Sequence, residues 1–171
     1  MIDKRLTMRL TNHWNSLRGG LVLPQWEHFD IAKFDDIWQQ CCGWSVRPGD
    51  VNTILFTYEH VGNSIKQAVG SDLTGKVFSS LLQGFPGPRV KAVVRNELTE
   101  EMFTDHFRNF PAAHIVQKID KVIKKLSPVI EDGRFTDEHN RIVRYRSCLL
   151  PFGKEDNVTN IVLGLSWKSY Q

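Results

Sequence analysis

The sequence has no long hydrophobic run, few cysteines and little excess charge. No window approaches 18 consecutive apolar residues, which argues against a membrane-spanning helix, and the first ten residues lack the apolar core of a secretory signal. Three cysteines are an odd number that does not suit a disulfide framework. A formal net charge of +3 is too small to indicate nucleic-acid binding by itself. These absences predict a cytoplasmic protein.

Motifs for catalysis and metal binding are also missing. We find no Walker-type phosphate loop, no G-x-S-x-G turn, no H-E-x-x-H pair and no Cys or His cluster with zinc spacing. Cys41 and Cys42 are adjacent and Cys148 lies in an apolar run, a pattern typical of cysteines that act as small buried hydrophobes. We therefore expect a protein that is not an enzyme and has no bound metal.

Residues 3–18 predict an amphipathic helix that ends at Gly19-Gly20. Its apolar positions at helical spacing are Leu6, Leu10, Trp14 and Leu17. Two interpretations are open. The helix packs on its own domain, or these four residues form a dimer or partner face. Residues 21–43 are too apolar for a free linker and are expected to wrap the core.

The remaining sequence predicts short strands, helices and a final antiparallel meander. The expected strands cover residues 44–47, 53–60, 129–135, 141–150 and 161–167. The expected helices cover residues 64–69, 99–108 and 111–126. Both faces of 141–150 carry apolar residues, although a sheet with one wet face alternates more cleanly. We infer that the N-terminal helix covers the second face.

The break Gly84-Phe85-Pro86-Gly87-Pro88 divides this pattern. We expect an N-terminal helix and wrapping segment over 1–43, then one domain over 44–171. Residues 84–110 read as a helical insertion within that domain.

The order of elements, two strands, helices and three strands, is that of the PAS fold. Several stretches also resemble a family of small stand-alone bacterial PAS-like proteins. These are His13-Trp14, Leu17-Arg18-Gly19-Gly20, Pro24, Phe29-Asp30-Ile31, Phe56, Tyr58, Val61-Gly62, Gly70-Ser71-Asp72-Leu73-Thr74-Gly75-Lys76 and Leu149-Leu150-Pro151-Phe152. They are spread over most of the chain. The insertion at 84–110 departs from the pattern.

The resemblance implies an α+β fold: a five-stranded antiparallel sheet with helices packed on one face, and the N-terminal amphipathic helix in addition. It also implies a non-enzymatic sensory or adaptor module of bacterial signal transduction. Such a module is expected to bind a small ligand between helices and sheet, a partner signalling protein, or both, and to form a homodimer. Candidate pocket residues are Phe56, Tyr58, Ile115, Ile119, Tyr145, Ser147 and Trp167. The same aromatic residues are equally expected of an ordinary core.

Other functions stay open but lack a supporting motif. Haem would need an axial histidine, for which His114 is the candidate, and we expect no cofactor there. An enzyme on a cone-like α+β fold would use Asp105-His106, or Asp120 with His114. Weak nucleic-acid binding would use a basic face made of Lys118, Lys121, Lys124, Lys125, Arg141, Arg144 and Arg146.

Overall fold

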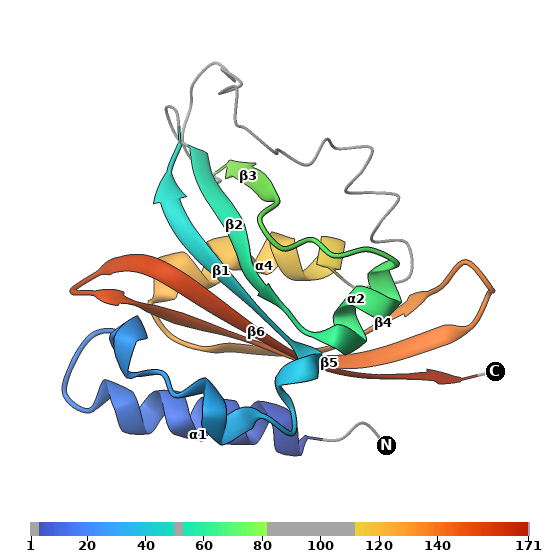
Figure 1. The fold of residues 1–171 in the computed structure, drawn as a ribbon, viewed down its shortest axis with the longest axis horizontal. Helices are drawn as coiled ribbons and strands as arrows, with labels where there is room; N and C mark the ends of the chain where they lie inside the picture. Colours follow the sequence, from blue (N-terminus) through green and yellow to red (C-terminus); the bar gives the residue numbers. More distant parts are fainter. Residues whose placement is uncertain (1–3, 50–52, 82–111, 171) are drawn as a thin grey trace.

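The structure, a computed structural model, describes residues 4–49, 53–81 and 112–170 (Figure 1). Its strands are β1 (Cys41–Pro48), β2 (Thr53–Val61), β3 (Val77–Leu81), β4 (Val129–Thr136), β5 (Ile142–Lys154) and β6 (Asn157–Tyr170). Its helices are α1 (Arg5–Arg18), α2 (Asn63–Val69) and α4 (Ala112–Lys125), with 3₁₀ turns η1 (Trp26–His28), η2 (Ile31–Phe34) and η3 (Trp38–Gln40). None of the described helices is both long enough and apolar enough to cross a membrane.

The strands form one open antiparallel sheet in the order β3-β2-β1-β6-β5-β4. This confirms the α+β class and all five expected strands, but the expected count of five was wrong. The sixth strand is β3, which extends the sheet beyond β2, with Phe78 opposite Phe56. The predicted insertion at 84–110 and its helix at 99–108 lie outside the described residues.

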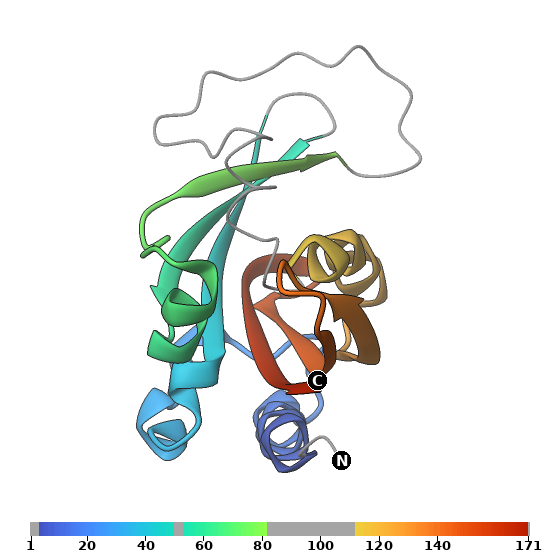
Figure 2. The same cartoon turned by 90° about the vertical axis from the view of Figure 1, so that its right-hand side faces the viewer.

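The two faces of the sheet carry different helices (Figure 2). A Cβ built on Gly164 of β6 would meet the side chains of Leu6 and Leu10, so this residue faces α1. Neighbouring residues of a strand point to opposite sides, and Leu165 therefore faces the side on which α4 lies. We call the α1 side the outer face and the α4 side the inner face.

The apolar stripe of α1 lies on β5 and β6. Leu6, Leu10 and Trp14 are buried and Leu17 is partly buried against the core. The Trp14 indole Nε1 donates a 2.6 Å hydrogen bond to the carbonyl of Pro151. The four residues predicted as a dimer or partner face therefore pack within their own chain. The apolar residues on both faces of residues 141–150 correctly predicted that α1 covers the second face.

The segment between α1 and β1 also packs on the outer face. Phe29 lies at its centre and its ring contacts those of five neighbours. These rings, together with Phe29, form the outer aromatic cluster: His13, Trp26, Phe34, Trp38 and Phe152. At its end, a Cβ on Gly62 would lie 2.1 Å from the carbonyl oxygen of Gln39, so only glycine lets η3 and β2 approach this closely. The segment wraps the sheet as expected, although the strand begins at Cys41 and not at 44.

Helix α4 crosses the inner face of β4 and β5. Ile119 and Val122 are buried there, and the helix ends where Leu126 takes a φ of 54°. On its other side, Lys118 pairs with Glu131 of β4 at 3.2 Å. The helix predicted over 111–126 is therefore confirmed. One lysine of its basic side, Lys118, forms an ion pair within the chain.

Candidate functional site

The predicted pocket residues whose side chains are described share the inner face but fall into two groups. Phe56 and Tyr58 lie on β2, while Tyr145 and Ser147 lie on β5. Ile119 projects from α4, and Trp167 of β6 lies opposite Tyr145. Ile115 belongs to α4, but its side chain is not among those described. Strands β1 and β6 separate the two groups, and Ile161 and Leu163 fill part of the space between them with buried aliphatic carbon.

The group on β2 belongs to the inner aromatic cluster, which we define as Trp44, Phe56, Tyr58 and Phe78. The Phe56 and Phe78 rings stack with centroids 4.8 Å apart. Trp44 approaches Tyr58 edge-on at 5.7 Å and Phe78 at 5.9 Å. All four residues are at most 4% exposed. Three neighbouring strands thus supply one continuous aromatic surface on the inner face.

The cluster contains polar atoms but no charge. The Trp44 Nε1 is buried without a hydrogen bond of good geometry, and the Tyr58 phenol is the polar group beside it. Burial raises the pKa of Tyr58 well above its usual range, so its phenol stays protonated. A buried donor without an acceptor costs free energy, about 1–3 kcal/mol for a neutral group. A bound molecule with a neutral acceptor atom would remove that cost.

The second group surrounds Tyr145. A Cβ on Gly133 would lie 2.3 Å from the Tyr145 Cζ, so the phenol ring lies directly over this glycine of β4. Burial, and then the nearby Glu131 carboxylate, raise the pKa of Tyr145. Since Lys118 holds that carboxylate, this end of the inner face combines a neutral phenol with an ion pair at its rim.

The residues named for other chemistries do not assemble into a site among the described residues. The His114 side chain is not described, and Asp105-His106 lies outside the described ranges. Asp120 is held by Lys124 at 3.7 Å. Burial raises the pKa of the Cys148 thiol to about 12, so it is a poor nucleophile. Within residues 4–49, 53–81 and 112–170, no group of three or more His, Cys, Asp or Glu side chains is placed to hold a metal.

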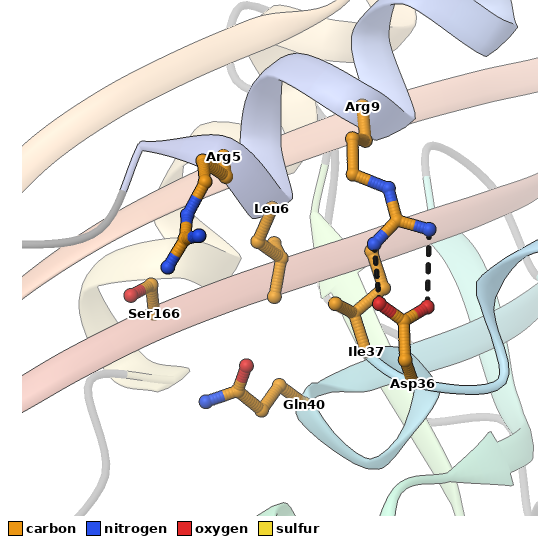
Figure 3. A pocket seen from close by; sticks show the side chains of 7 residues that line it. All are labelled: Arg5, Leu6, Arg9, Asp36, Ile37, Gln40 and Ser166. Atoms are coloured by element: carbon orange, nitrogen blue, oxygen red, sulfur yellow. Dashed lines mark hydrogen bonds and ion pairs between the residues drawn. The ribbon is translucent and has the colours of Figure 1, made fainter.

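A pocket lies on the outer face (Figure 3), and no pattern in the sequence predicted it. It encloses about 290 Å³ between α1, η3 and β6. Its lining consists of Arg5, Leu6, Arg9, Asp36, Ile37, Gln40 and Ser166. Arg9 donates two hydrogen bonds to the Asp36 carboxylate, and this pairing lowers the pKa of Asp36. The two residues are 27 positions apart, so no local spacing could reveal the pair.

Comparison with known proteins leaves the family open. No protein-family model matches the chain, and no curated protein matches it either.

Proposed function

We propose that the chain is a PAS-like sensory or adaptor module that binds a small, uncharged, partly aromatic ligand on the inner face of its sheet and passes the signal on by protein contact. The observation that carries this proposal is the Trp44 N–H, which is buried within the inner aromatic cluster without a well-formed hydrogen bond and has only the neutral Tyr58 phenol beside it. Most buried donors in a core are hydrogen-bonded, so an incompletely satisfied donor within an aromatic cluster supports a ligand site. Among the described residues, His13 Nε2, His60 Nε2 and Ser71 Oγ are also buried without a partner, but they lie outside the inner aromatic cluster.

The arrangement of elements supports the same proposal. The five strands expected of a PAS-like domain lie side by side in one antiparallel sheet, with α4 across the inner face. The resemblance in the sequence places the ligand between helices and sheet, which is this face. We expect the module to act in the cytoplasm of a bacterium. A homodimer would use surfaces other than Leu6, Leu10 and Trp14, because these are buried within the chain.

Native mass spectrometry of the purified protein tests the proposal, with the denatured mass as reference. We expect an additional mass that acid releases. If the native and denatured masses agree for protein purified without exposure to acid, the ligand part of the proposal is wrong.

Two buried tryptophans on opposite faces provide matched variants. Trp44 belongs to the inner aromatic cluster and Trp38 to the outer aromatic cluster, and they are 2% and 8% exposed. A phenylalanine at each position removes the indole N–H and keeps an aromatic ring. We expect Trp44→Phe to abolish the additional mass and Trp38→Phe to keep it. The reverse pattern would move the ligand to the outer face and contradict the inner-face proposal.

A further inference from the structure

Three cations form a row across the outer face where the sheet extends beyond α1. Arg144 of β5 lies directly opposite Arg134 of β4 and directly opposite Lys168 of β6. Arg146, two residues further along β5, donates to the hydroxyl of Thr7 on α1. Arg144 lies on the same outer face as Arg146, because side chains alternate along a strand. All three side chains of the row are exposed.

The row is unfavourable for the fold itself. Like charges directly opposite each other destabilise a pair of strands. Among the described residues, none of the three cations forms an ion pair with a carboxylate, whereas the neighbouring Arg146 is paired with Asp132 at 2.7 Å. The Tyr170 ring offsets part of this repulsion, because its centroid lies 5.4 Å from the Arg144 guanidinium and 5.7 Å from the Lys168 amine, but it provides no opposite charge. A surface that reduces stability in this way is suited to binding an anionic partner.

The spacing of the row selects among anionic partners. Adjacent strands lie about 4.7–4.9 Å apart, so the three cations follow each other at that interval. Residues three or four apart on a helix have Cβ atoms about 5–6 Å apart, a close match. Alternate residues of an extended strand lie about 6.8 Å apart, which fits the row less well. Beside the row, Ile142 is 48% exposed and lies opposite Tyr170, which adds an apolar contact.

We infer that Arg134, Arg144 and Lys168 bind an acidic amphipathic helix of a partner protein, which lies across β4, β5 and β6 with glutamate or aspartate at every third or fourth position. This surface would make the protein contact of the proposed function. Its role in signalling rests on that proposed function. The binding itself does not need the inner-face ligand.

Fluorescence anisotropy tests this surface with the full chain. The probe is a labelled helical peptide with one stripe of glutamates at i, i+4 and i+7, and its reference is a peptide of the same composition with the glutamates distributed around the helix. We expect the striped peptide to bind about tenfold more tightly, with an affinity that falls as salt is raised. Arg144→Thr should weaken binding about fivefold, the upper end for one exposed ion pair.

Arg47→Thr is the matched control, because Arg47 is an exposed strand arginine on β1, away from the row. It should leave binding unchanged.

A folding check accompanies the binding measurement. Arg144→Thr should also raise the melting temperature, which would show that its weaker binding does not come from unfolding. Equal binding of both peptides, or unchanged binding by Arg144→Thr, would overturn the proposal. Tighter Arg144-dependent binding to phosphatidylserine vesicles or to oligo-dT would overturn the choice of a helix. If the native mass experiment finds no bound ligand, the ligand part of the proposed function fails, but these peptide-binding results still stand.

Discussion

The molecule has two aromatic clusters on opposite faces of one sheet, and they differ in their polar atoms. In the outer cluster, His13 contacts Phe29 and Phe34, and nearby His60 stacks on Trp38 with centroids 4.9 Å apart. The inner cluster has no group that titrates near neutral pH. We therefore expect the hold of the outer cluster on the N-terminal segment to depend on pH, and we expect no such dependence from the neutral inner cluster.

The largest effect is expected from removing the central ring of either cluster. Phe29→Ala and Phe78→Ala should each lower the free energy of unfolding by about 3–5 kcal/mol, because each deletes a buried aromatic ring. The clusters should differ in limited proteolysis of the folded protein. Phe29→Ala should expose residues 21–40 to cleavage, and Phe78→Ala should not. Identical cleavage patterns would show that the outer cluster does not hold this segment.

Substitutions at two glycines of the outer face test how tightly α1 packs on the sheet. A Cβ on Gly164 would lie 2.4 Å from the Leu10 Cδ1, whereas a Cβ on Gly43, also on the outer face, meets nothing closer than 3.8 Å. Gly164→Ala should cost about 1–3 kcal/mol in urea unfolding because the insertion overpacks the interface. Gly43→Ala should cost less than that. Equal costs would mean that α1 shifts freely to make room.

Acidification should weaken the outer cluster selectively. Burial lowers the pKa of both His13 and His60 from 6.5, so the unfolded chain binds protons more readily than the folded protein. Stability is therefore full above pH 6.5 and falls as the pH is lowered from there towards the folded-state pKa values. Urea unfolding at pH 7.5, 6 and 5 measures this fall.

His13→Phe should flatten the decline between pH 7.5 and 5. His28→Gln, which changes an exposed histidine, should leave it unchanged. If the wild type is equally stable at pH 5 and 7.5, the histidines do not connect the outer cluster to pH.

The smallest effect is expected from thiol reagents. Burial raises the pKa of Cys41, Cys42 and Cys148, so little thiolate is available in the folded protein. At pH 8 we expect negligible labelling by a disulfide reagent without denaturant and three labelled thiols in urea. Rapid labelling of Cys41 or Cys148 in the folded state would contradict the packing of the outer face, where Cys148 contacts the position of Gly164.

Long periodic segments made most of the fold predictable. The stripe of α4 and the alternation in β6 gave elements within a few residues of their positions in the structure. Strand β3 was missed because it is a five-residue edge strand whose sequence, Val-Phe-Ser-Ser-Leu, does not alternate between apolar and polar residues. Strand β5 continues through Pro151, whose carbonyl accepts from Trp14, to Lys154, so the strand end predicted at residue 150 came too early.

The candidate site was predictable only in part. Alternation placed Phe56 and Tyr58 on one face, and the structure agrees. Trp44 was overlooked as a member of the site, although it opens the expected strand 44–47, because its relation to Tyr58 depends on the register of β1 with β2. A β-bulge between Gly43 and Trp44 shifts that register. The row Arg134, Arg144 and Lys168 likewise depends on pairing across three strands, which no linear spacing shows.

The hydrogen bond between Trp14 and Pro151 sets the order of events during synthesis. The two residues are 137 positions apart, so at about 5–20 residues per second the ribosome adds Pro151 roughly ten seconds after Trp14. Strand β1 likewise cannot pair with β6, its neighbour in the middle of the sheet, until β6 has been synthesised. For that interval the apolar stripe of α1 has no sheet to cover. We therefore expect the nascent chain to expose this apolar stripe, and to complete its sheet only after its last strands have emerged.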